Sequence, residues 1–190
     1  MTLKLAIIVG STREGRFGPV PARWIADRAG RRDDLAVDVL DLADLDLPDV
    51  LRPLGAEPAP EVALVSPRLA DAEAFLVVTP EYNHSFPAPL KSAIDWHYTQ
   101  WRAKPVGFVS YGGMGGGLRA VEQLRQVFAE LHAVTVRDVV SFHGAWTRFD
   151  EDGEPVDAAG ADAAAKVLLD QLVWWGTALR DARAQRPYEV

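Results

Sequence analysis

The sequence contains no cysteine. Disulfide bonds, thiolate catalysis and cysteine-ligated metal ions or clusters are therefore excluded, while the redox compartment is left open. No apolar run approaches the roughly 18 residues of a membrane-spanning helix. The chain passes from Met1 directly into a short apolar segment, without the charged start, long apolar centre and cleavage site of a secretory signal. The lack of a secretory signal and of a membrane-spanning run predicts a cytoplasmic location.

Basic residues are fewer than acidic residues. The chain has 20 lysines and arginines against 27 aspartates and glutamates, a formal net charge of -7, which argues against a nucleic-acid-binding protein. Hydrophobic residues make up 48% of the 190 positions, an ordinary globular proportion that allows a sizeable core. Because no repeat or low-complexity tract divides the chain, residues 1–190 are predicted to form a single domain.

A polar loop at residues 79–87 is the first candidate for a ligand-binding site. It follows the apolar run from Ala74 to Val78, which is typical of a strand covered on both faces. Pro80 has no N–H for a sheet ladder, so the chain is expected to leave the sheet here, at the carboxyl edge of a parallel strand where α/β proteins bind ligands. The loop's glutamate, tyrosine, asparagine, histidine and serine suit recognition of a planar heterocycle. An ordinary solvated turn is the alternative for this stretch alone.

A second candidate is the loop at residues 10–19, between an apolar strand at 3–9 and a helical pattern from about Pro21. A strand, a small polar loop and a helix start together favour an anion, through free N–H groups and the helix dipole. The loop also supplies side-chain donors at Ser11, Thr12, Arg13 and Arg16. It matches neither the Walker A nor the GxGxxG pattern, which favours a single phosphate, as in a mononucleotide. A turn with two solvated arginines is the alternative.

The third candidate is the glycine-rich loop from Tyr111 to Gly117. It follows the apolar strand Val106–Ser110 and precedes an amphipathic helix at 118–132. Glycines in such a position are expected where backbone approaches a ligand closely or adopts positive φ. A flexible linker is the alternative.

Strands alternate with helices along the whole chain, with further strands expected at 35–42 and at 134–142, the last interrupted near Arg137 and Asp138. This alternation predicts an α/β protein with helices on both faces of a parallel sheet. Five strands in one small domain favour a flavodoxin-like three-layer sandwich, a five-stranded parallel sheet of strand order 2-1-3-4-5. The three loops follow the first, third and fourth strands, so we expect them to meet at one edge.

Three other segments carry weaker signals. The stretch 43–60 is rich in acidic residues, and its aspartates and the preceding Asp41 match no EF-hand spacing, so a solvated acidic loop is preferred to a metal site. A helix is expected at 61–72, where Pro67 implies a late start or a kink. The helix at 87–101 carries Leu90, Ile94, Trp96, His97 and Trp101. These large groups exceed one core face and predict a contact with a partner subunit, the alternative being that all of them are core.

Three motifs together resemble the NADPH-dependent FMN reductase family: Gly10-Ser11-Thr12-Arg13, Pro80-Glu81-Tyr82-Asn83 with the helix start Leu90–Trp96, and Ser110-Tyr111-Gly112-Gly113. The resemblance implies a flavodoxin-like fold that holds FMN non-covalently. It places the phosphate at Ser11, Thr12, Arg13, Arg16 and Phe17. It places the isoalloxazine between Pro80, Glu81, Tyr82 and Asn83 on one side and Ser110, Tyr111, Gly112 and Gly113 on the other. The chain departs from the family at Gly18, Pro19 and Val20, which supply no side-chain donor for the phosphate.

The resemblance also implies an activity. NAD(P)H would pass hydride to FMN, which would reduce a second acceptor such as a quinone or a flavin. The choice of NADPH over NADH comes from the family alone. No metal, nucleic-acid or membrane partner is expected, and the family's homodimers or homotetramers would form here through the helix around Leu90–Trp101. A flavodoxin-type electron carrier and a flavin-binding regulatory module are the alternatives. His84 is not assigned a catalytic role.

Overall fold

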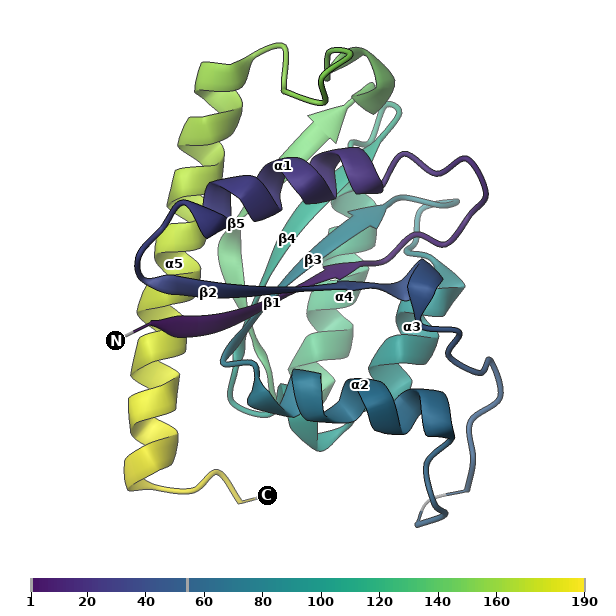
Figure 1. Ribbon diagram of the computed structural model, residues 1–190, viewed down its shortest axis with the longest axis vertical. Coiled ribbons are helices and arrows are strands. Elements are labelled where there is room, and N and C mark those ends of the chain that lie inside the picture. Colours follow the sequence, from purple (N-terminus) through teal and green to yellow (C-terminus); the bar gives the residue numbers. More distant parts are fainter. Residues whose placement is uncertain (1, 54, 190) are drawn as a thin grey trace.

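The computed structural model describes residues 2–53 and 55–189 of the chain (Figure 1). Five parallel strands form one sheet in the order β2-β1-β3-β4-β5. The strands are β1 (Leu3–Val9), β2 (Leu35–Asp41), β3 (Ala74–Pro80), β4 (Pro105–Gly112) and β5 (Val134–His143). The helices are α1 (Pro19–Gly30), α2 (Pro60–Asp71), α3 (Ala88–Asp95), α4 (Leu118–Glu130) and α5 (Ala158–Gln185). The predicted flavodoxin-like fold is confirmed.

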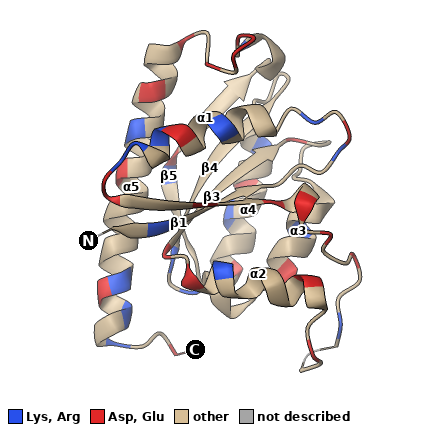
Figure 2. Ribbon diagram, viewed as in Figure 1, with Lys and Arg blue, Asp and Glu red and all other residues tan. Residues whose placement is uncertain are grey.

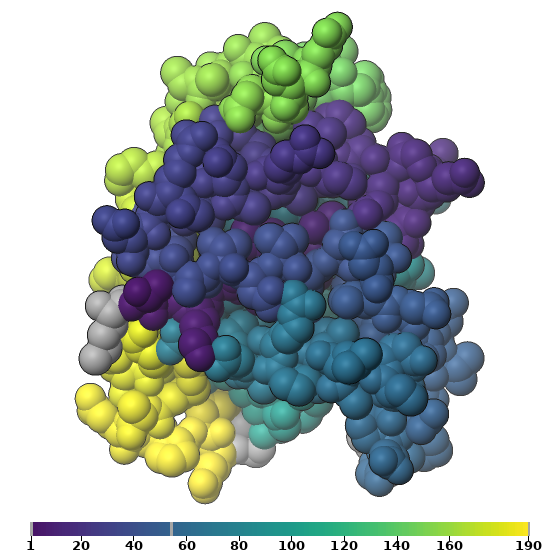
Figure 3. Space-filling model, viewed as in Figure 1, coloured from purple at the N-terminus to yellow at the C-terminus, as the bar shows by residue number. Residues whose placement is uncertain are grey.

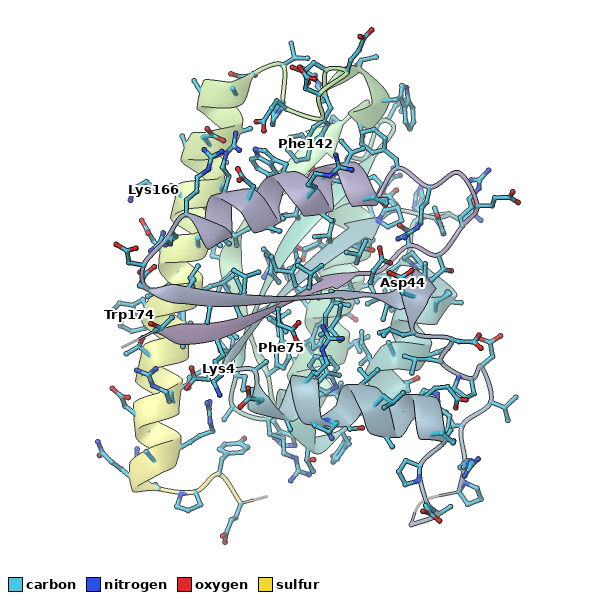
Figure 4. The ribbon with its side chains drawn as sticks, viewed as in Figure 1. Lys4, Asp44, Phe75, Phe142, Lys166 and Trp174 are labelled. Carbon is cyan, nitrogen blue, oxygen red and sulfur yellow. The ribbon has the colours of Figure 1, made fainter. Side chains whose placement is uncertain are left out.

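The sheet separates two hydrophobic cores. On β1, Leu5 and Ile7 pack in a cluster with α1 and α5, whereas Ala6 and Ile8 pack with α2, α3 and α4, because successive side chains of a strand point to opposite faces. Figure 1 shows these helices on the two sides of the sheet. Figure 4 shows Phe142 on the α1 side and Phe75 on the α2 side.

Several element boundaries differ from the prediction in informative ways. β3 extends to Pro80, which pairs with Tyr111 as the last residue of the strand, so the chain leaves the sheet after the proline rather than before it. β5 is one strand, but its register against β4 shifts between Val106 and Phe108, which confirms an irregularity next to Arg137 and Asp138. The helix α2 begins at Pro60, so a late start caused by Pro67 is wrong.

The helix after the central loop is shorter than predicted. α3 ends at Asp95, and a 3₁₀ turn at Thr99–Trp101 follows. Leu90, Ile94, His97 and Trp101 are all buried inside the chain itself. The partly buried Trp96 donates its indole N–H to the carbonyl of Pro48. The large side chains of this segment therefore pack within the protein's own core and are not evidence for a subunit contact. Assembly through this helix stays a prediction that rests on the family resemblance.

Candidate functional site

Loops that follow β1, β3 and β4 line one open cleft at the carboxyl edge of the sheet. The cleft has a volume of about 430 Å³. Its lining residues are Arg13, Glu14, Gly15, Arg16, Phe17, Pro80, Glu81, Tyr82, Tyr111, Gly112, Gly113 and Trp146. Nine of the thirteen predicted site residues are in this set; Ser11, Thr12, Asn83 and Ser110 are not.

The loop after β1 presents unused backbone donors at one end of the cleft. Within the described residues, no hydrogen bond uses the backbone N–H of Thr12, Arg13, Glu14, Gly15 or Phe17. The loop projects from the right-hand edge of the molecule in Figure 3, and the ribbon of Figure 2 shows basic and acidic positions alternating along it. Free N–H groups gathered in a loop before a helix are a site for an anion.

The first turn of α1 contributes less to that site than the sequence suggested. Pro19 and Pro21 have no N–H, and the N–H groups of Val20 and Ala22 are bonded to the carbonyls of Phe17 and Gly18. The donors at this end therefore come from the loop rather than from the helix start. The guanidinium of Arg13 forms no ion pair or hydrogen bond with another described residue, so it is available to a ligand.

Arg16, by contrast, is already paired. Its two terminal nitrogens donate to both carboxylate oxygens of Asp41, each at 2.7 Å, and Nη1 also donates to the backbone oxygen of Ser11 at 2.8 Å. The hydrogen bonds that Arg16 donates to Asp41 raise the pKa of Arg16 above its usual value. Asp41 lies in the predicted second strand, as the last residue of β2, but it is paired with this arginine rather than solvated with the acidic residues that follow it.

The predicted phosphate donor Ser11 is completely buried. The hydroxyl of Tyr111 donates to Ser11 Oγ at 3.1 Å, which joins the loop after β1 to the end of β4. Burial raises the pKa of Tyr111 well above its usual value, while the hydrogen bond to Ser11 opposes that rise. At this depth Tyr111 stays neutral and acts as a hydrogen-bond donor. Its ring packs edge-on against Phe17, with 5.8 Å between the ring centroids.

The loop after β3 is a tight turn fixed to α4. Tyr82 and Ser85 exchange two backbone hydrogen bonds, and Asn83 and His84 both have positive φ, 50° and 67°. Such a two-residue turn favours asparagine at its first position. The His84 side chain meets Arg119 rather than the cleft, which fits a role in holding the loop.

One acidic side chain anchors the same loop from inside the cleft. Glu81 Oε1 forms an ion pair with Arg119 Nε at 2.6 Å, and Oε2 accepts from the backbone N–H of Arg119 at 3.3 Å. The Glu81 side chain is only 9% exposed, so this pair is shielded from solvent on the Glu81 side. The backbone N–H of Glu81 donates to the carbonyl of Tyr111, which ties this loop to the end of β4.

Two serine hydroxyls hold the glycine-rich loop after β4 through hydrogen bonds to its backbone. Ser110 and Ser141 both donate to the carbonyl of Gly116 at 2.8 Å, so Ser110 supports the loop rather than lining the cleft. Gly112 and Gly113 line the cleft, and a Cβ on Gly113 would lie 3.7 Å from Trp146.

Sequence reasoning missed Trp146, which lies in the 3₁₀ turn Ala145–Thr147 after β5 and is 68% exposed. An exposed tryptophan in a polar segment just after the last strand was the signal available in the sequence. Its position beside the glycine loop makes it a flat wall at the open side of the cleft.

Comparisons with known proteins agree with this geometry. The family model described as NADPH-dependent FMN reductase matches residues 3–147. The chain belongs to the NADPH-dependent FMN reductase family. Among relatives, an NAD(P)H-dependent FMN reductase of Schizosaccharomyces pombe is 33% identical over 140 residues, which span 67% of this chain and 66% of the relative. A probable NADPH:quinone oxidoreductase of Oryza sativa subsp. japonica is 34% identical over 176 residues, 88% of this chain and 89% of the relative.

One solved structure is similar to this chain over nearly its whole length. FerB from Paracoccus denitrificans, a flavoenzyme NAD(P)H:(acceptor) oxidoreductase, superposes with a TM-score of 0.75 at 25% identity, over 93% of this chain and 98% of FerB. The family match ends at Thr147, one residue beyond Trp146. The cleft residues therefore all lie inside the matched segment.

The residues present fit FMN, the cofactor that the family implies. One end of the cleft offers backbone N–H groups and a guanidinium that no described residue bonds, as a phosphate requires. The other end is bounded by Pro80, Tyr82, two glycines and Trp146, which are flat or lack side chains. Phosphate donors at one end and flat walls at the other match a mononucleotide with a large planar ring.

Proposed function

We propose that the chain is an FMN-dependent NAD(P)H oxidoreductase that reduces a small acceptor such as a quinone or a flavin. The observation that carries the proposal is the single cleft, in a member of this family, that joins an anion-binding loop to a glycine-lined slot. When bound, FMN supplies hydride chemistry, and the protein supplies position, shielding and electrostatics. NADPH is the favoured donor because the family description and the rice relative both name it.

The protein's own groups divide between binding and shielding. Arg13 and the loop N–H groups hold the phosphate through charge-assisted hydrogen bonds. Tyr82, Gly112 and Gly113 bound the ring, and Trp146 limits access of water from the open side. Glu81 keeps the wall after β3 in place through Arg119. The chemistry does not require a protein acid, and no side chain is assigned that role.

A quinone acceptor is favoured by the name of the rice relative, which is described as a probable quinone oxidoreductase. A flavodoxin-type carrier would be reduced by a protein partner and would not oxidise NAD(P)H by itself. Within the described residues, no helix is both long and apolar enough to cross a membrane. The cytoplasmic location stays a prediction, as does a homodimer or homotetramer.

Turnover by purified protein tests the function. The protein, loaded with FMN, is expected to oxidise NADPH faster when a soluble quinone is present, because the quinone withdraws the electrons. The measurement is the loss of nicotinamide absorbance with NADPH and with NADH, each with and without quinone, against FMN without protein. An absence of turnover with both nucleotides would leave the carrier or the regulatory module as the function.

Arg13→Ala is expected to weaken FMN binding by about 1–3 kcal/mol, the scale of a charge-assisted hydrogen bond to phosphate. Riboflavin, which lacks the phosphate, should bind the variant and the wild type alike. Arg137→Ala is a control of equal charge change, since Arg137 is exposed on β5 next to Asp138. Titration of flavin fluorescence measures all of these affinities, and an unchanged FMN affinity in Arg13→Ala would remove this residue from the site.

A further inference from the structure

Two of the predicted FMN ligands, Arg16 and Tyr111, donate hydrogen bonds to other residues of the protein. A guanidinium has five N–H groups. Arg16 uses three of them, two on Asp41 and one on the backbone oxygen of Ser11. A phosphate that approached Arg16 would also approach the carboxylate of Asp41, which repels it. This geometry suits a residue that shapes the loop better than one that binds the phosphate.

Ser11 is the residue on which these contacts meet. Arg16 holds its backbone oxygen, and the Tyr111 hydroxyl donates to its side-chain oxygen. Gly18 closes over the same oxygen, because a Cβ at position 18 would lie 2.2 Å from Ser11 Oγ and 2.7 Å from the Tyr111 hydroxyl. Gly18, which supplies no side-chain donor to the phosphate, is therefore required because a larger residue would clash with Ser11 and Tyr111. Ser11 is fixed from three directions at the start of the loop with the free N–H groups.

The contacts also tie the loop to neighbouring strands. Asp41 is the last residue of β2, the strand beside β1. Tyr111 lies on β4, which is two strands away from β1 on the other side. Arg16, Asp41 and Tyr111 thus brace the loop from both sides. A loop that is ordered before binding avoids the entropy loss of ordering when the ligand arrives.

We propose that Arg16, Asp41 and Tyr111 are positioning residues that preform the phosphate loop around Ser11, while Arg13 and the loop N–H groups contact the phosphate. This inference rests on the proposed function, because it assigns the loop to the phosphate of FMN. The inference gives the two arginines different roles: Arg13 binds the ligand, and Arg16 holds the binding loop in place.

The sign of one substitution distinguishes positioning from direct binding. Asp41→Asn removes a negative charge near the phosphate loop, so if Arg16 bound the phosphate directly, the variant would bind FMN more tightly. If the ion pair positions the loop, the same change weakens FMN binding. We expect a loss of about tenfold, the scale of one additional loop residue to be ordered on binding. A weakening therefore cannot come from the change in charge.

The experiment compares the affinities of FMN and riboflavin by fluorescence titration for wild type, Asp41→Asn, Arg16→Ala and the double variant. Riboflavin is the matched control because it lacks the phosphate. Positioning predicts that FMN affinity falls in all three variants and that riboflavin affinity is retained. The loss is at least as large in Arg16→Ala as in Asp41→Asn, because Arg16→Ala also removes the bond to the backbone oxygen of Ser11. FMN binding as tight as wild type in Asp41→Asn, or an equal loss of FMN and riboflavin, would overturn the inference.

Tyr111→Phe supplies an independent arm that removes only the hydroxyl bonded to Ser11. It keeps the aromatic ring in the cleft, so a severalfold loss for FMN without a loss for riboflavin is expected. Urea unfolding of each apoprotein shows which variants fold. If the Arg16 and Asp41 variants do not fold, the FMN affinity of Tyr111→Phe alone tests the proposal. A Tyr111→Phe variant with wild-type FMN affinity would contradict the proposal. A wild-type protein that binds no FMN would reject the proposed function together with this inference, whereas normal binding by the variants rejects the inference alone.

Discussion

Replacing Trp101 with alanine is expected to lower the free energy of unfolding by about 3–5 kcal/mol, the range for removal of a large buried aromatic side chain. Trp101 is 1% exposed and packs against Phe75 and Phe128, at ring-centroid distances of 4.6 and 5.4 Å. Its indole N–H donates to the carbonyls of Ile94 and His97, at the end of α3 and just beyond it. The substitution therefore leaves a cavity and also removes the indole donor from the His97 carbonyl, whereas the Ile94 carbonyl keeps its bond from the backbone N–H of His97.

Urea unfolding measures this effect, and Tyr98→Ala is the matched control. Tyr98 lies three residues earlier and is 51% exposed, so its removal should change stability by less than about 1 kcal/mol. If Trp101 served a subunit contact instead, its removal would change the oligomeric state in gel filtration while the protomer kept its stability. That outcome would restore the interface that the sequence suggested.

The fold could be predicted because local signals agreed with one another. The apolar runs at 3–9, 74–78 and 106–110 are buried on both faces, as their composition indicated. Each predicted loop lies between a strand and a helix. Since parallel strands all end at the same edge, the order of elements alone brought the three loops together.

The partners within the site could not be predicted in the same way. Arg16 meets Asp41 25 residues away, and Tyr111 meets Ser11 100 residues away. These contacts depend on strand register and on the direction of individual side chains, which periodicity does not contain. A basic side chain in a phosphate loop therefore looks the same in the sequence when it binds the ligand and when it holds the loop.

The aromatic residues after the central loop show a related limit. Hydrophobic patterning indicates that a side chain is buried but does not say against what. His97, for example, is buried, with Nδ1 against the carbonyl of Ala93 at 2.8 Å, and desolvation lowers its pKa. Because α3 ends early and the chain turns back towards α2, these side chains enter the core instead of forming a continuous helical face.

Gly117→Ala is expected to lower the free energy of unfolding by about 2–5 kcal/mol, the sum of a left-handed conformation forced on alanine and of overpacking. Gly117 has φ 85° at the N-cap of α4. A Cβ there would lie 2.6 Å from Ser110 Cβ and 2.9 Å from the backbone nitrogen of Tyr111. Neither atom is the flexible end of a side chain, so the end of β4 must move.

That movement couples stability to flavin binding, although Gly117 does not line the cleft. Displacing Tyr111 disturbs its bond to Ser11 and shifts the adjoining Gly112 and Gly113, so both ends of the FMN site are expected to lose affinity. Gly113→Ala is the control for stability, because its φ is not positive and its Cβ would meet Trp146 at an ordinary 3.7 Å. Urea unfolding and FMN titration of the two variants measure the difference. Equal stability of the two would show that the loop does not depend on the positive φ at Gly117, and normal FMN affinity in a destabilised Gly117→Ala would show that the end of β4 does not set the shape of the cleft.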